Sequence, residues 1–217
     1  MSISIFIADD HTIVRDGLRA LLEIDGDIKY IGGASDGRSA VQQVRELRPD
    51  VILMDISMPE LNGIDATSRI MAEMPEARII ILSMHSTTEH VYRALQVGAR
   101  GYLLKEAAGK EIVAAVRSVA RGKRYLSEKI SEMMMDDISH RNGRERDQSP
   151  LERLSQRERE ILQLVAEGKS SSDIAAILFL SPKSVDTYRS RLMGKLAIKD
   201  FAGLIRFAII HGLTRLD

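Results

Sequence analysis

An uninterrupted apolar run, Val51-Ile52-Leu53-Met54, ends on the acid Asp55 and constrains the fold more than any other stretch of the chain. The run is short, contains β-branched residues and is bounded by Pro49 and Pro59. These properties indicate a strand that is buried on both faces of a parallel sheet. Ligands of such sheets bind beyond the carboxyl ends of the strands, so Asp55 is placed for chemistry rather than for packing.

Segments with strand and helix patterns alternate along the first 125 residues. Strands are predicted at 2–8, 28–34, 51–54, 78–82 and 101–104, and helices at 11–23, 38–47, 63–74, 89–97 and 110–121. Each crossover between parallel strands is right-handed and must cover a face of the sheet. Five strands alternating with five helices therefore predict a doubly wound, flavodoxin-like α/β domain.

Polar residues stand directly after four of the predicted strands: Asp9, Asp10, Asp55, Ser83 and Lys105. If these strands are neighbours, the five side chains share one crevice. Clustered carboxylates raise one another's pKa unless a cation relieves them, and their hard oxygens suit Mg²⁺. An ammonium on a flexible stem suits an anion that arrives and leaves. The arrangement predicts a carboxylate that accepts a phosphoryl group.

Each of these residues also has a structural interpretation. Singly, Asp55 could begin a turn, Asp9 and Asp10 could cap the first helix, and Ser83 could be a turn residue. Three histidines near the crevice lack a metal-ligand spacing and are expected to be solvated residues at helix starts: His11, His85 and His90.

The first half resembles the receiver domain of bacterial response regulators over residues 2 to about 125. The resemblance is carried by Asp9-Asp10, Asp55, Met58-Pro59, Asn62-Gly63, Ser83, Tyr102 and Lys105. It implies that a sensor histidine kinase phosphorylates Asp55, with enzymatic chemistry limited to gain and loss of that phosphoryl group. A phosphohydrolase that depends on Mg²⁺ is the alternative for the same cluster.

The same resemblance implies a role for each residue of the pocket. Asp10, Asp55 and the carbonyl of Ser57 would hold Mg²⁺, and Asp9 would act through a water molecule. Ser83 and Lys105 would bind the phosphoryl oxygens, and Tyr102 would be the aromatic switch that turns inward when Ser83 is recruited. Glu106 departs from the family pattern, because many receivers have proline after the lysine.

Two domains are expected, at residues 1–125 and 151–217, joined by a short helix and a flexible linker at 126–150. The helix is predicted at 127–137 and the polar tether at 138–150. The chain has no cysteine, no basic leader and no apolar stretch of membrane-spanning length. A soluble protein of the bacterial cytoplasm, without membrane contact, is therefore expected.

The second half predicts an all-α domain. Ser155 and Glu158 form a capping box before one helix, a second helix starts at Ser172, and Ser181-Pro182 opens a third. Two short helices separated by a brief turn are the outline of a helix-turn-helix. From residue 151 onward the chain has 11 basic and 8 acidic residues, a mild excess that does not by itself indicate a nucleic-acid surface.

The helix after Ser181 places Val185, Leu192 and Leu196 on its core side. The opposite side carries short polar and basic groups: Lys183, Asp186, Thr187, Ser190 and Arg191. Such a side can enter a major groove, with Lys and Arg on the phosphates, although a polar helix face is more often only solvated.

The second half resembles the LuxR-type helix-turn-helix. The matching segments are 154–155, 157–162, 166–170, 173–175, 178, 180–181, 183–185 and 195–196. Together with the receiver, nearly the whole chain resembles the NarL/FixJ family of response regulators.

The family implies one set of residues near the phosphate backbone: Lys183, Ser184, Tyr188, Arg191 and Lys195. It implies a second set toward the bases: Asp186, Thr187 and Ser190. Tyr188 replaces the usual histidine, and Asp186 is an acid where basic or amide residues are common. An acid in the groove accepts from cytosine but repels phosphates, which leaves the sequence preference open.

The last helix, from Asp200 to Gly212, is more apolar than so small a domain requires. In the family it pairs two DNA-binding domains on a two-fold site, while the alternative is that it completes a four-helix core. The expected protein is a two-component regulator that binds double-stranded promoter DNA as a homodimer, with RNA polymerase as a possible further partner. An adapter that signals through protein contacts alone is the remaining alternative.

Overall fold

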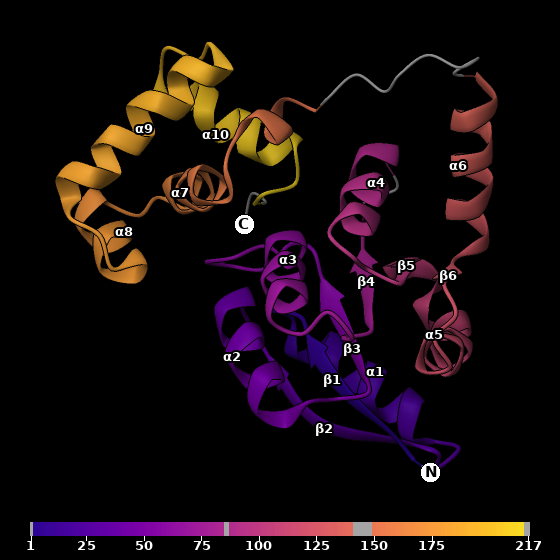
Figure 1. Cartoon of the computed structure of the whole chain (residues 1–217). Helices are drawn as coiled ribbons and strands as arrows, with labels where there is room; N and C mark the ends of the chain where they lie inside the picture. Colours follow the sequence, from indigo (N-terminus) through magenta and orange to yellow (C-terminus); the bar gives the residue numbers. More distant parts are fainter. Residues whose placement is uncertain (1, 85–86, 141–148, 215–217) are drawn as a thin grey trace. The chain divides into compact units, whose positions relative to one another are not determined.

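The computed structural model describes residues 2–84, 87–140 and 149–214 (Figure 1). The chain forms two compact units, one built from most of residues 1–145 and the other containing residues 146–217. Part of the tether expected at 138–150, residues 141–148, lies outside the described residues.

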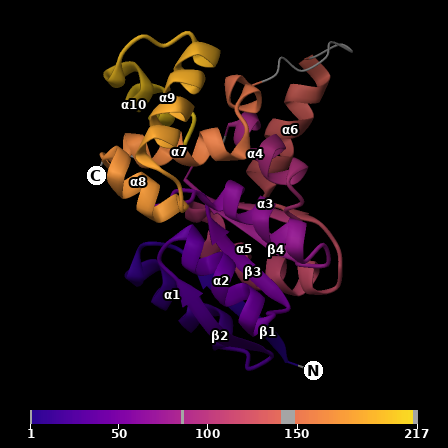
Figure 2. The same cartoon turned by 60° about the vertical axis from the view of Figure 1, so that its left-hand side comes forward.

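The first unit is a parallel sheet with helices on both faces (Figures 1 and 2). Its elements in chain order are β1 (Ile3–Ala8), α1 (Thr12–Glu23), β2 (Ile28–Ala34), α2 (Gly37–Leu47), β3 (Val51–Asp55), α3 (Gly63–Glu73), β4 (Ile79–Ser83), α4 (Thr88–Gln96), β5 (Gly101–Leu104), α5 (Lys105–Ala120), β6 (Tyr125–Leu126) and α6 (Glu128–His140). The strands lie in the order β2-β1-β3-β4-β5-β6, so β1 and β3 are neighbours at the point where the order reverses. The predicted doubly wound fold is confirmed.

The central strand β3 is buried at every position, as its unbroken apolar sequence requires. Alternate strand residues such as Leu53 and Ile80 pack with α1 and α5 in one cluster. Helices α2, α3 and α4 pack against one another in sequence, α2 with α3 and α3 with α4. Burying both faces of the sheet leaves only its edges and strand ends open to solvent.

One strand of this unit was not predicted, and one helix start was predicted wrongly. The sheet has a sixth strand, in which Tyr125 and Leu126 pair with Gly101 and Tyr102 of β5. Helix α5 begins at Lys105 rather than at residue 110, so it follows β5 without an intervening loop. The helix predicted at 127–137 is present as α6 and continues to His140.

The second unit is a small helical domain around one apolar core. It contains the 3₁₀ turn η1 (Pro150–Arg153) and the helices α7 (Gln156–Ala166), α8 (Ser171–Leu178), α9 (Pro182–Leu196) and α10 (Phe201–Ile210). Val185 and Leu192 of α9 are fully buried in this core, as the helical spacing predicted. None of the helices in the described parts of the chain is long and apolar enough to cross a membrane.

Capping residues set the helix starts in the second unit. The capping box of Ser155 and Glu158 is confirmed, and Ser181 caps α9 ahead of Pro182. The start of α8 was predicted one residue late: it begins at Ser171 because Ser170 forms a capping box with Asp173. Each cap satisfies backbone N–H groups that have no partner inside the helix.

Candidate functional site

The carboxyl ends of three neighbouring strands bring the predicted polar residues together. Asp9 follows β1 directly, Asp55 is the last residue of β3, and Ser83 is the last residue of β4. Ala8 pairs with Met54 across β1 and β3, so these strands end at the same level. The predicted crevice therefore forms at one edge of the sheet, and we call the group Asp9, Asp10, Asp55 and Lys105 the acidic pocket.

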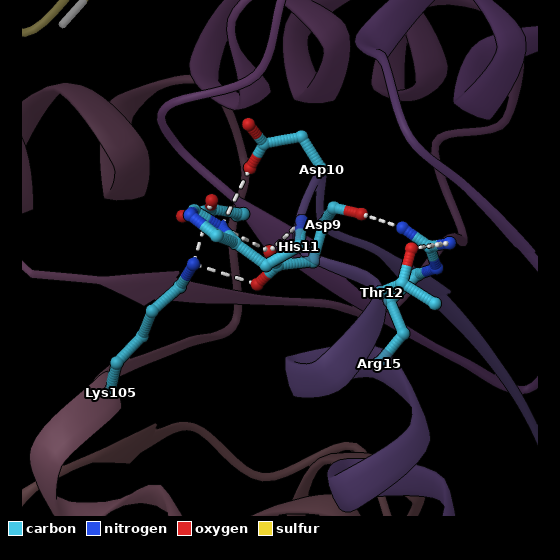
Figure 3. Close-up of polar contacts among 7 residues, drawn as sticks. Asp9, Asp10, His11, Thr12, Arg15 and Lys105 are labelled. Carbon is cyan, nitrogen blue, oxygen red and sulfur yellow. Dashed lines mark hydrogen bonds and ion pairs between the residues drawn. The ribbon is translucent and has the colours of Figure 1, made fainter. Parts of the chain in front are cut away.

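Lys105 joins the carboxylates of the acidic pocket (Figure 3). Its Nζ lies 2.7 Å from Oδ2 of Asp9 and 2.7 Å from Oδ2 of Asp55. Asp9 is fully buried, Asp55 is 2% exposed and the Lys105 side chain is 12% exposed. At this depth an unpaired charge would be costly, so the ammonium and the two carboxylates stabilise one another.

Burial and like charges change the protonation of the phosphoacceptor candidate. Burial, with the nearby charges of Asp9 and Asp10, raises the pKa of Asp55 to about 6, although Lys105 opposes the rise. Burial alone would lower the pKa of Lys105, but Asp55 and Asp9 together raise it. A cation bound near the three acids would therefore stabilise their ionised forms.

His11 is at the start of α1, as expected, and its ring lies beside the acids Asp9 and Asp10 (Figure 3). Its Nδ1 is 2.9 Å from Oδ1 of Asp10 and 3.2 Å from Oδ1 of Asp9, although the side chain is 47% exposed. Arg15 donates to the carbonyl of Asp9 and holds the turn between β1 and α1. No spacing signal in the sequence identified His11, because it is adjacent to the acids that it contacts.

The donor set of the pocket fits a hard divalent cation. Asp9, Asp10, His11 and Asp55 each offer one ligand atom, and these atoms lie within 4.8 Å of one another. Three of the four are carboxylate oxygens, which Mg²⁺ prefers. Ser57 is half-buried in the turn after β3, two residues beyond Asp55. The pocket is therefore an acidic, metal-compatible site.

Tyr102 is already turned toward Ser83. Its side chain is fully buried and its hydroxyl is hydrogen-bonded to Ser83, while burial raises its pKa to about 12. The carbonyl of Tyr102 accepts a hydrogen bond of 3.1 Å from the N–H of Ser127, the residue before α6. Tyr102 thus contacts both Ser83, at the end of β4, and the residue before α6.

Two local features fix the backbone around Asp55 and Lys105. Glu106 replaces the family proline without displacing Lys105: it lies in the first turn of α5 and pairs with Lys129 of α6 at 2.8 Å. On the other side, a Cβ on Gly63 would lie 1.9 Å from the carbonyl oxygen of Asp55. Only glycine therefore fits beside the phosphoacceptor candidate.

The outward side of α9 carries the residues predicted to contact DNA. Exposed positions are Lys183, Asp186, Thr187, Ser190, Arg191 and Lys195, whereas Ser184 and Tyr188 are half-buried. Tyr188 packs against the apolar core of the domain, and its hydroxyl makes no hydrogen bond within the described residues.

Several of these side chains have partners inside the domain, which the sequence did not reveal. Lys195 places Nζ 2.7 Å from Oε2 of Glu158, the buried acid of the α7 capping box. The Oγ of Ser171 donates to Oδ1 of Asp186 at 2.8 Å. Thr187 donates its hydroxyl to the carbonyl of Lys183 at 2.9 Å. The charged groups of Lys183 and Arg191 have no such partner among the described residues.

Helix α10 contributes to the core and also presents an apolar outer face. Leu204 and Ala208 are fully buried, as expected for a helix that completes the core. The other side forms an open hollow of about 330 Å³ lined by Ala202, Ile205, Arg206, Ile209 and Ile210. One face of α10 therefore completes the core, and the apolar hollow lies on another face of the same helix.

Two protein-family models match the chain. Residues 5–117 match the response regulator receiver domain, and residues 152–208 match the luxR family of bacterial regulatory proteins. The first range lies within the unit that holds the parallel sheet, and the second lies within the helical domain.

Similar proteins cover nearly the whole chain. UvrY of Escherichia coli is 40% identical over 216 residues, which are 99% of this chain and 97% of UvrY. The oxygen regulatory protein NreC of Staphylococcus carnosus is 37% identical over 94% of this chain and 96% of NreC.

Solved structures of response regulators also match the chain. A LuxR-family response regulator from Aurantimonas sp. matches with a TM-score of 0.62 and 32% identity, over 64% of this chain and 99% of that one. The response regulator RcsB in complex with DNA matches with a TM-score of 0.59 and 26% identity, over 95% and 98%. This chain belongs to the NarL/FixJ family of two-component response regulators, which join a receiver domain to a luxR-type DNA-binding domain.

Proposed function

We propose that a sensor histidine kinase phosphorylates Asp55 and thereby controls the binding of promoter DNA by the second unit, in a bacterial cytoplasm. The observation that carries this proposal is the pairing of Asp55 with Lys105 beside two further acids at the end of the sheet. A buried carboxylate next to an ammonium can exchange that partner for the oxygens of a phosphoryl group.

The transfer needs one oxygen of the Asp55 carboxylate as the nucleophile. This oxygen attacks the phosphorus of the donor phosphohistidine in line, and the O–P bond forms as the N–P bond to the imidazole breaks. Lys105 and Ser83 bind the phosphoryl oxygens. Tyr102, whose hydroxyl already meets Ser83, is the aromatic switch that carries the change.

Mg²⁺ is the proposed cofactor of this step. Asp10, Asp55 and the carbonyl of Ser57 would hold the ion, with Asp9 acting through a water molecule. The bound ion would supply positive charge for the clustered carboxylates and for the phosphoryl oxygens.

The exposed side of α9 is the proposed DNA-binding surface. Lys183 and Arg191 are exposed, have no partner among the described residues, and would contact the phosphates together with Ser184 and Tyr188. Ser190 and Thr187 would face the bases. Lys195 would reach a phosphate only after leaving Glu158. The match to RcsB bound to DNA supports this assignment.

Pairing of two chains through α10 is part of the proposal. The apolar hollow of Ile205 and Ile209 is a surface that water solvates poorly, and a second copy could cover it. A symmetric dimer would present two α9 helices to two half-sites.

The first test measures transfer of labelled phosphate to the full chain from a histidine kinase or from acetyl phosphate, with Mg²⁺ present. Wild-type protein should become labelled and Asp55→Asn should not. Asp136→Asn, which removes an exposed acid from α6, is the matched control and should be labelled normally. Equal labelling of Asp55→Asn and wild type would refute the assignment of Asp55.

A second test addresses the chemistry of the pocket and the role of the second unit. Sustained release of phosphate from small phosphate esters would favour the Mg²⁺-dependent phosphohydrolase instead. Binding to promoter DNA that weakens with salt, and weakens further on replacing Lys183 and Arg191, would exclude an adapter that acts through protein contacts alone.

A further inference from the structure

Asp186 is an acid on the exposed side of a helix that is proposed to enter DNA. It is the only acid in α9, whose sequence otherwise carries the cations Lys183, Arg189, Arg191 and Lys195. A carboxylate on this surface repels the phosphate backbone, so other groups must offset that repulsion when DNA binds.

The carboxylate of Asp186 is held by α8. The Oγ of Ser171, the first residue of α8, donates to Oδ1 of Asp186 at 2.8 Å. The same Oγ accepts a hydrogen bond of 3.2 Å from Nη1 of Arg189. Since the hydroxyl accepts from the guanidinium, its proton is directed at the carboxylate.

Arg189, also on α9, contacts both Ser171 and Asp186. Its Nη1 lies 3.9 Å from Oδ1 of Asp186, which brings the two opposite charges together. The guanidinium also lies 5.9 Å from the ring centre of Phe201, at the start of α10. One turn of α9 is thus connected to α8 by a hydroxyl and to α10 by a guanidinium.

The position of Asp186 is also favourable for α8 itself. A negative charge near the first residues of a helix interacts with the positive end of the helix dipole. The contact with Ser171 therefore partly compensates the charge of Asp186 before any DNA is present, and Arg189 compensates it further.

We propose that Asp186 is a positioning residue, which locks α9 against the start of α8 through Ser171 and Arg189, and that it does not read a base. This proposal rests on the proposed DNA-binding function. It differs from the expectation that Asp186 faces the bases, where its carboxylate would accept from the amino group of cytosine. The two roles give different results when base preference and affinity are measured separately.

The experiment uses the full-length phosphorylated chain and duplexes that the wild type selects from a random-sequence pool. Asp186→Ala should weaken binding to the selected duplexes about tenfold, the loss typical of a hydrogen bond to a charged group. The preferred base at every position should stay the same. Ser171→Ala should give a loss of affinity of similar size. The double variant should lose little more, because both changes break the same hydrogen bond between Ser171 and Asp186.

Conservative variants provide the matched controls. Asp186→Asn keeps an oxygen that accepts from Ser171 and should bind within about threefold of wild type. Ser171→Thr keeps the hydroxyl and should do the same. A changed base preference in Asp186→Ala, or unchanged affinity in Ser171→Ala, would overturn the proposal.

Hydrogen exchange in the free protein separates this proposal from the proposed function. Asp186→Ala should speed amide exchange in the first turns of α8 and α9, and Asp186→Asn should restore the slow rates. If the wild type selects no duplex, the proposed DNA binding fails, and the exchange rates still decide about Asp186. Unchanged exchange in Asp186→Ala would then refute its positioning role.

Discussion

The acidic pocket and the exposed side of α9 carry similar residue types in opposite surroundings. In the pocket, Asp9 and Asp55 are buried and share the ammonium of Lys105. On α9 the charged groups are exposed, and some of them, such as Asp186 and Lys195, bind neighbours within their own domain. Buried charges must be paired for the fold to be stable. An exposed charged side chain, by contrast, can either bind a ligand or make contacts within its own domain.

The largest expected difference between the two regions concerns glycine. Gly63→Ala would push a Cβ to within 1.9 Å of the carbonyl oxygen of Asp55, whereas Gly194→Ala in α9 meets no atom within 4 Å. The pocket variant should lose about 3 kcal/mol of unfolding free energy, or more, because the backbone must move. Gly194→Ala should gain up to about 1 kcal/mol from helix propensity. Urea unfolding of the full chain measures both, and equal stabilities would contradict the close packing.

The second prediction concerns pH. The folded pKa of Asp55 is raised to about 6 from an ordinary value of 3.8, so the native state binds its proton more tightly than the unfolded state. The resulting stability is fully present below about pH 3.8 and is lost as the pH rises through about 6.

Asp55→Asn does not titrate and escapes this loss. Relative to wild type, its unfolding free energy should improve by about 2 kcal/mol between pH 4 and pH 7 when divalent cations are removed. Urea unfolding of both proteins at a series of pH values tests this. Added Mg²⁺ should stabilise the wild type and leave Asp55→Asn nearly unchanged, and a difference independent of pH would count against the buried carboxylate.

Two tyrosine substitutions, one in each region, should change the unfolding free energy by smaller amounts. Tyr102→Phe removes a buried hydroxyl that is bonded to Ser83, and it should cost about 1 kcal/mol. Tyr188→Phe on α9 removes a hydroxyl without a hydrogen bond among the described residues, and it should change stability by less than about 0.5 kcal/mol. Thermal unfolding of the two variants gives the comparison, and a larger cost for Tyr188→Phe would reverse it.

The smallest effects are expected for single cations on α9. Lys183→Gln and Arg191→Gln should each lower the slope of log affinity against log salt by about 1, because each removes one of the proposed phosphate contacts. Lys195→Gln should lower it less, since its ammonium is already paired with Glu158. Titrations at several salt concentrations measure the slopes, and three equal changes would mean that Lys195 leaves Glu158 on binding DNA.

The sequence predicted the pocket because topology determines its neighbours. Apolar runs that end on Asp9, Asp55 and Ser83 indicate strand ends, and right-handed crossovers bring those ends to one edge of the sheet. The short strand β6 was missed because two residues carry no periodicity. The early start of α5 was missed because the apolar pattern of that helix becomes visible only some residues after Lys105.

The internal contacts of α9 could not be predicted in the same way. The spacing of Val185 and Leu192 identified the buried side of the helix, and that prediction is confirmed. The contacts of Asp186 with Ser171 and of Lys195 with Glu158 depend on how the helices pack, and helix periodicity does not specify the packing partner.

The acidic pocket is assembled from opposite ends of the first unit's sequence. Asp9 follows the first strand, and its ammonium partner Lys105 follows the fifth. The contact between such distant residues cannot form until the intervening chain has been synthesised and folded. When Asp55 has just left the ribosome, Lys105 has not yet been synthesised, so the acidic pocket is complete only after the first unit has folded.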